Sequence, residues 1–374
     1  MKKRKIRNLT LCLLTSVIFI MFLSISQGQV KAGKEVPDND HPDETYGISD
    51  EVFPPFSGEN KHFTVDKYVG VFNEGFSNSA SEMVLRNWNA IGLVSIEELV
   101  NGIIVEDLKY YPVMIIPTAG LHGLDNSSTF RQKLGDYVSA GGTVIVFAQQ
   151  HGYEFNSLPG GEVSGYGWKE DQSSLTNAVY IDTYHPMFAG QGNAILDAGV
   201  DGYFTDWPSN ATVLLRRTKN GMPAMVAYPY GSGWVVASTL YSDYSYGHGG
   251  TTKDELSLVR DLISWAKDPD REINEYKPGE MVSINVPVTN HIDSPSNSIV
   301  LTLLDPNRNV IDTTEVVHPL NPGESAEITF NYLASLPLGI WWVNYSLQDE
   351  SGNTVQYETD GERFQISYHH WERR

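Results

Sequence analysis

The chain has 374 residues, a formal net charge of −20 and a single cysteine, Cys12. A surface this acidic repels nucleic acid and anionic lipid. One cysteine excludes an internal disulfide framework and a zinc–thiolate site. The length suffices for two domains that are held together by their own hydrophobic cores. We therefore expect no nucleic-acid partner, and no sequence motif predicts a cofactor.

The N-terminal segment has the pattern of a secretory signal. Basic residues at 2–7 precede an apolar run over residues 9–25, and Val30-Lys31-Ala32 resembles a cleavage motif. We predict a signal peptide over residues 1–32 and a secreted or cell-surface protein. The alternative is an uncleaved N-terminal anchor, because the run is about as long as the shortest membrane span. Cleavage would leave a net charge of about −26, because the segment carries six cations and no acid.

An acidic, proline-rich stretch over residues 33–61 predicts a solvated leader without structure. An α/β domain is expected over residues 62–267. Its first half alternates apolar strand patterns with helical patterns, which indicates a parallel sheet covered on both faces. The expected elements are a strand at 68–72, a helix at 79–88, a strand at 113–117, a helix at 130–140 and a strand at 144–147.

The second half of this domain begins with a long segment, residues 152–208, that is rich in glycine and aromatic residues. Loops of this length usually form lids or binding surfaces. Residues 224–239 predict a hairpin that turns at 231–233. A loop at 241–250 and a helix at 254–267 complete the expected elements.

The sequence pattern changes after a predicted linker at 268–275. Residues 276–368 show about seven alternating strand patterns with turn signals and without a helical pattern, which is typical of an immunoglobulin-like β-sandwich. Trp341 and Trp342 are adjacent in one strand and should face opposite sides. We expect one of them in the core and the other pointing outward.

Several stretches of the first domain resemble the class I glutamine amidotransferase-like superfamily. They are Ile115-Ile116-Pro117, AGGTVIV at 140–146, Tyr184-His185-Pro186 and YGSGWVV at 230–236. The resemblance covers about residues 64–267 and implies a flavodoxin-like parallel sheet with helices on both faces. The C-terminal residues resemble bacterial surface immunoglobulin-like modules in their alternation of strand patterns and turn signals.

The chain departs from this superfamily at the position of the catalytic cysteine. Gln149, Gln150 and His151 stand where catalytic members carry a thiol between glycines. An amide does not act as a nucleophile, and histidine rarely does so in acyl transfer. The resemblance therefore implies a non-catalytic member, and we do not expect glutaminase chemistry.

Polar and aromatic side chains follow the strand ends of the predicted sheet and line the long segment after it. In α/β sheets ligands bind at the carboxyl ends of strands, and a mixture of aromatic rings with amides, carboxylates and imidazoles suits a sugar. The alternative is that these groups pair with loop backbone. The candidate ligand-binding residues are Gln149, Gln150, His151, Tyr153, Glu154, Trp168, Asp182, His185, Asp243, Tyr246 and His248.

These residues leave three functional hypotheses open. The first is an exported, non-catalytic binding or assembly protein with a glycan or surface partner. The second is a secreted hydrolase that pairs His151 with Asp243 or Glu154 as acid and base. The third is a purely structural surface module whose sandwich forms a homo-oligomer. A metal site from His151, Asp182, His185, Asp243 and His248 lacks diagnostic spacing, so we predict none.

Overall fold

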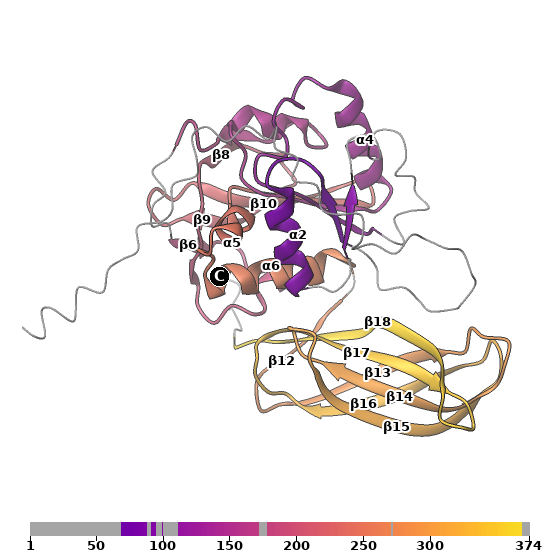
Figure 1. Cartoon of the computed structure of the whole chain (residues 1–374). Coiled ribbons are helices and arrows are strands. Elements are labelled where there is room, and N and C mark those ends of the chain that lie inside the picture. The colour runs from indigo at the N-terminus through magenta and orange to yellow at the C-terminus, as the bar shows by residue number, and fades with distance from the viewer. Residues whose placement is uncertain are drawn as a thin grey trace, which may run out of the picture. The chain divides into compact units, whose positions relative to one another are not determined.

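The computed structural model describes residues 69–87, 91–94, 99, 111–171, 178–270 and 272–368. The protein is mixed α/β and rich in strands, which form several sheets (Figure 1). The α/β prediction is confirmed at this level. The predicted signal peptide at 1–32 and the acidic leader at 33–61 lie outside the described residues.

The largest sheet has nine strands, and five neighbours in it run parallel in the order β2-β1-β3-β4-β11. The strands β1, β3 and β4 are four residues long and completely buried, as expected for strands that are covered on both faces. The bounds are β1 Val69–Phe72, β2 Ile91–Val94, β3 Val113–Ile116, β4 Thr143–Val146 and β11 Gly233–Ser238.

The other four strands join the sheet by antiparallel pairing, so the predicted parallel sheet accounts for only part of it. The expected hairpin at 224–239 is confirmed as β10–β11, and it reverses the chain. β9 and β6 reverse it twice more. The carboxyl end of β6 therefore lies at the opposite edge of the sheet from that of β4. These strands are β10 Pro223–Tyr230, β9 Thr212–Arg217, β6 Ala178–Ile181 and β7 Ile195–Asp197.

Helices cover both faces of the nine-stranded sheet. α2 (Ser77–Asn87) and α6 (Lys253–Ala266) pack into one apolar cluster with the side chain of Ile145. α4 (Ser128–Ser139) packs into a second cluster with Val144 and Val146, the neighbours of Ile145 in β4. Because successive strand residues point to opposite faces, β4 contributes to both cores.

A short helix, α5 (Ser242–Gly247), occupies most of the loop predicted at 241–250. The prediction failed because tertiary packing decides here: Ser242, Asp243 and Tyr244 are all buried. The segment at 152–208 also contains regular elements instead of an open lid. They are η2 (Gly152–Ser157), β5 (Ser164–Tyr166), η3 (Pro186–Phe188) and β8 (Tyr203–Asp206), besides β6 and β7.

The C-terminal residues form seven strands, in a five-stranded sheet of order β12-β18-β17-β14-β15 and a pair β13–β16. Both sheets contribute to one apolar cluster that contains Trp341. The strands are β12 Asn274–Tyr276, β13 Met281–Thr289, β14 Ser296–Leu304, β15 Val310–Leu320, β16 Ser325–Leu333, β17 Gly339–Gln348 and β18 Thr354–Ile366.

Trp341 and Trp342 are both buried, so the expectation that one points to solvent is wrong. Trp342 belongs to the apolar cluster that includes residues of α6, and the Arg308 guanidinium lies 4.3 Å from its ring centroid. The two rings do lie in different clusters, as the alternation of a strand requires.

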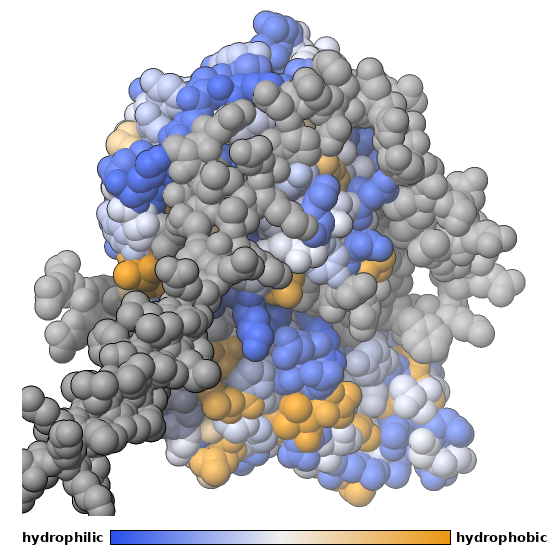
Figure 2. Space-filling model, turned by 60° about the vertical axis from the view of Figure 1, so that its left-hand side comes forward, coloured by the Kyte–Doolittle hydropathy of each residue, from blue (hydrophilic) through white to orange (hydrophobic). Residues whose placement is uncertain are grey.

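Large hydrophobic side chains are exposed at several points on the C-terminal strands, and Figure 2 shows orange patches among hydrophilic surface. The exposed residues on these strands include Met281, Val310, Ile311, Val317 and Leu333. The predicted homo-oligomer stays a hypothesis.

Within the part of the chain that the structure describes, every helix is too short or too polar to cross a lipid bilayer.

Candidate functional site

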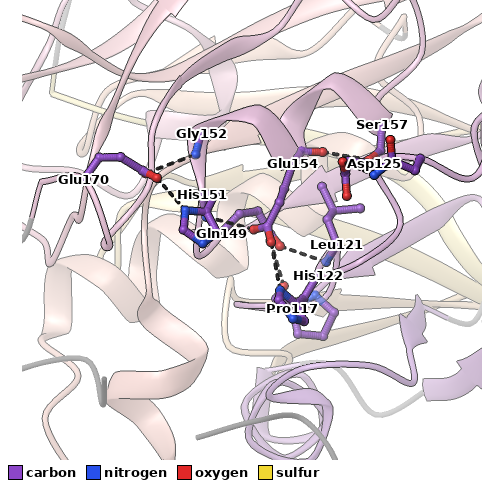
Figure 3. Close-up of polar contacts among 11 residues, drawn as sticks. Pro117, Leu121, His122, Asp125, Gln149, His151, Gly152, Glu154, Ser157 and Glu170 are labelled. Atoms are coloured by element: carbon purple, nitrogen blue, oxygen red, sulfur yellow. Dashed lines mark hydrogen bonds and ion pairs between the residues drawn. The ribbon is translucent and has the colours of Figure 1, made fainter. Parts of the chain in front are cut away.

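Gln149 lies just past the end of β4 and is completely buried. Its Oε1 accepts a hydrogen bond from the main-chain N–H of Leu121 at 2.8 Å (Figure 3). Its Nε2 donates to the main-chain oxygens of Pro117 at 3.1 Å and Phe147 at 2.9 Å. The side chain therefore supports the turn after β3 and is no ligand-binding group, contrary to prediction, because that turn's buried backbone groups need partners.

His151 and Glu170 form a close side-chain pair at this strand end. The Nδ1 of His151 lies 2.5 Å from Oε1 of Glu170 (Figure 3). The other carboxylate oxygen accepts from the main-chain N–H groups of Gly167 at 2.7 Å and Gly152 at 3.3 Å. Both side chains are about one-third exposed, at 28% and 31%. The pair is thus fixed by backbone and still open to solvent.

Glu154 connects this pair to a second histidine. One of its oxygens accepts from the main-chain N–H of His151 at 2.9 Å, and the other lies 3.0 Å from Nδ1 of His122 (Figure 3). Burial raises the pKa of the Glu154 carboxyl, while these hydrogen bonds act in the opposite direction. Glu154 is 1% exposed, so it orients the histidines from below and does not itself reach a ligand.

Tyr153 completes the accessible part of the site. Its ring stacks on that of His151, with centroids 5.0 Å apart and an angle of 11° between the planes, and it is 50% exposed. We call His122, His151, Tyr153 and Glu170 the strand-end surface. Gln150 lies beside it and is half-buried. Sequence reasoning missed His122 and Glu170, since neither directly follows a strand.

Two further candidates, Trp168 and Asp243, lie in the interior near this strand end. Trp168 is 4% exposed and packs with Ala148 in a small apolar cluster. Asp243 accepts from Thr118, at 2.5 Å from the hydroxyl and 2.8 Å from the main-chain N–H. Burial raises the pKa of Asp243 to about 6, although these bonds oppose the shift. Both side chains stabilise the fold, contrary to the ligand-binding prediction.

Tyr246 and His248 belong to α5 and its C-terminal end. Tyr246 is partly buried against the cluster that contains α2 and α6. His248 is exposed, and its Nδ1 donates to the main-chain oxygen of Tyr244 at 2.8 Å. Its ring lies 4.1 Å from that of Tyr244. Neither residue has a contact with the strand-end surface among the described interactions.

Asp182 and His185 follow β6 and therefore lie at the opposite edge of the sheet, which corrects their assignment to the site. Asp182 pairs with Arg216 at 2.9 Å. The ring of His185 lies 4.7 Å from that of Trp265, which contacts Trp234 near the start of β11. Burial lowers the pKa of His185 to about 4. The five residues considered as metal ligands therefore do not lie together. Within the described ranges, no group of three acidic, histidine or cysteine side chains could hold a metal.

A buried charge cluster that the sequence did not predict lies next to the loop of Glu170. Arg217 is completely buried, and its Nη1 lies 2.6 Å from Asp171. Asp201 is 3% exposed, and its burial raises the pKa of its carboxyl to about 7, against the opposing effect of Arg217. Arg217 also donates to the main-chain oxygen of Gly202 at 3.1 Å. The cluster anchors the loop that carries Glu170.

No family model and no curated protein matches the chain. Among solved structures, a β-galactosidase from Bacillus circulans sp. alkalophilus is 14% identical and matches 70% of this chain and 41% of its own, with a TM-score of 0.38. PurLQS from Thermotoga maritima is 10% identical over 54% of this chain and 99% of its own, with a TM-score of 0.40. A cytoplasmic protein from Salmonella typhimurium is 15% identical over 52% and 88%, with a TM-score of 0.36. These TM-scores are below 0.5, so the likenesses carry no conclusion about fold or function.

Proposed function

We propose that this protein is an exported, non-catalytic binding or assembly protein, and that its strand-end surface binds a glycan. The observation that carries the proposal is the role of Gln149. It occupies the strand end with both amide atoms bonded to buried backbone. The position offers no nucleophile, because an amide does not act as one.

The strand-end surface has the chemistry that a sugar requires. Tyr153 is half-exposed and presents an aromatic ring, and the Glu170 carboxylate and His151 imidazole lie beside it. Rings stack on the apolar face of a sugar, while fixed planar polar groups bond its hydroxyls. Because Glu154 and the N–H groups of residues 152 and 167 fix these side chains, little entropy is lost on binding.

A glycan array followed by calorimetry on the full chain tests this proposal. We expect at least one neutral or basic glycan to bind, with Tyr153→Ala and His151→Ala each weakening the affinity about tenfold or more. Tyr368→Ala is the matched control, since Tyr368 is 54% exposed and follows the last strand, β18. Binding that survives both surface substitutions would remove the proposed surface from consideration, and glutamine hydrolysis would refute the non-catalytic assignment.

The rival function is a hydrolase, and the 2.5 Å pair of His151 and Glu170 favours it specifically. A carboxylate that holds Nδ1 leaves Nε2 of the imidazole to act as a general base. The acidic partner would be Glu170, not Asp243 or Glu154. Turnover of an ester, amide or glycoside panel that is lost in His151→Ala and reduced about 10²–10⁴-fold in Glu170→Gln would support it.

The finer fold assignment is part of the same proposal. We infer a flavodoxin-like, amidotransferase-like domain from the parallel strands β2-β1-β3-β4-β11 with helices on both faces. We infer an immunoglobulin-like domain from seven strands in two sheets around one core. Export follows from the N-terminal sequence pattern alone, and N-terminal sequencing of the secreted protein would test cleavage after residue 32.

A further inference from the structure

A groove of about 450 Å³ lies alongside α4, between that helix, the turn at residues 159–161 and Tyr230 at the end of β10. Its volume falls in the range of about 300–1,000 Å³ that is usual for small-molecule sites. The groove has no residue in common with the strand-end surface. We call it the α4 groove.

The walls of the α4 groove are fixed by hydrogen bonds between distant segments. The buried hydroxyl of Tyr228 donates to the main-chain oxygen of Pro159 at 2.8 Å, which holds the turn. The main-chain N–H of Ser232 donates to the oxygen of Ser139 at 3.0 Å, which holds the hairpin tip against the end of α4. The groove is therefore present before any ligand arrives, which reduces the cost of binding.

The floor of the groove contains a glycine in the interior of a helix. Gly135 is buried. Glycine in the interior of a helix makes the helix less stable than alanine does. A Cβ at this position would meet only the Tyr230 side chain, at 3.7 and 3.8 Å, which is ordinary van der Waals contact. Packing therefore does not require glycine. The missing methyl group leaves room for no more than one methyl-sized group between α4 and the ring of Tyr230.

The lining of the groove selects a neutral, hydroxyl-rich ligand. Gln132 and Asp136 are exposed on the groove side of α4 and supply planar hydrogen-bonding groups, and Tyr230 supplies one aromatic ring. Arg131 and Asp136 give the lining one charge of each sign, and the Arg131 Nη2 donates to the main-chain oxygen of Asp125 at 2.7 Å. The lining therefore has no net charge to attract a charged ligand, whereas a sugar ring can use the amide, the carboxylate and the aromatic face.

We propose that the α4 groove binds one hexose unit of a neutral glycan, at a site separate from the strand-end surface. Saturation-transfer NMR on the full chain tests this with the methyl glycosides of glucose, galactose, mannose and N-acetylglucosamine. We expect at least one of the four to bind, and Gly135→Ala to weaken it about tenfold or more because the new methyl group narrows the groove beside Tyr230. The same substitution should leave the melting temperature unchanged or raise it.

Controls separate this site from the other one. Gly192→Ala places a methyl group where nothing lies within 4 Å and should leave binding unchanged. Asp136→Ala should weaken binding, whereas His151→Ala should have no effect. The proposal is overturned if none of the four glycosides binds, or if Gly135→Ala binds as the parent does. It also fails if the binding is lost in His151→Ala alone, a result that would instead support the strand-end surface.

Discussion

Arg217 and Asp171 form a buried ion pair at 2.6 Å, in which the arginine side chain has no exposed surface. The same guanidinium donates to the main-chain oxygen of Gly202. Burial raises the pKa of the neighbouring Asp201 carboxyl, and the guanidinium offsets part of that rise. One buried cation thus connects β9 to two other segments. Since Asp171 directly follows Glu170, the pair also determines where the strand-end surface has its carboxylate.

Arg217→Met should lower the free energy of unfolding by about 3–5 kcal/mol, because it leaves buried carboxyl groups without their cation. Arg216→Met is the control. Arg216 precedes Arg217 in β9, points to the other face and pairs with Asp182 where the two side chains are 27% and 30% exposed. Its loss should cost at most about 1 kcal/mol. Urea unfolding of both variants measures the difference, and equal losses would contradict the assigned role.

Asp201 should make stability fall as the pH rises. Burial raises its pKa from 3.8 to about 7 in the folded state, so the folded protein binds this proton more tightly than the unfolded chain. The stabilisation is complete below pH 3.8 and is lost as the pH rises through about 7. Asp243 and Glu255, with pKa values raised to about 6 and about 7, act in the same direction.

Asp201→Asn removes this proton dependence and provides the measurement. The melting temperature of the variant relative to the parent should increase by several degrees between pH 5 and pH 7.5. Asp206→Asn is a suitable control, since Asp206 is exposed on β8. A relative melting temperature that is flat over this range would show that Asp201 titrates as it does in the unfolded chain.

His185 should have the opposite effect, on the acid side. Its burial lowers the pKa from 6.5 to about 4, so the folded state keeps the imidazole neutral while the unfolded chain takes up a proton. Stability from this group is present above pH 6.5 and is lost as the pH falls toward 4. His185→Asn should therefore gain melting temperature relative to the parent between pH 7 and pH 4.5. His248→Asn, at an exposed histidine, is the control variant.

Gln149→Ala should destabilise the protein by roughly 2–4 kcal/mol, because it removes three hydrogen bonds to buried backbone groups. The adjacent Gln150 is half-buried, and the described hydrogen bonds include none from its side chain. Gln150→Ala should therefore change stability by no more than about 0.5 kcal/mol. Chemical denaturation of the two variants compares them directly. A cost for Gln149→Ala below that of Gln150→Ala would refute the structural role.

Local sequence patterns predicted where β4 ends but not what Gln149 does there. The apolar run and the following polar residues define the strand end, since burial alone produces that pattern. The amide turns inward because the turn after β3 presents the main-chain N–H of Leu121 and the main-chain oxygen of Pro117 as hydrogen-bond partners. Such a partnership between distant segments leaves no periodic signal.

The misplacement of Asp182 and His185 has a topological cause. The sequence pattern did not indicate β6 within the segment at 152–208, and we placed the polar residues of that segment beside the ends of the parallel strands. The hairpin β10–β11 and the pairings of β9 and β6 reverse the chain three times.

His122 and Glu170 were missed because their partners are distant in the sequence. His122 and its partner are 32 residues apart, and Glu170 and its partner are 19 residues apart.

Residues 168–171 place three different contacts within a single turn of chain. Trp168 packs in the interior, Glu170 binds an imidazole at the surface, and Asp171 meets the buried Arg217. An insertion or deletion here would shift all three partners out of register together. We therefore expect homologous chains to vary in length on either side of this tetrapeptide while its internal spacing is preserved, which makes that spacing a marker for tracing relatives.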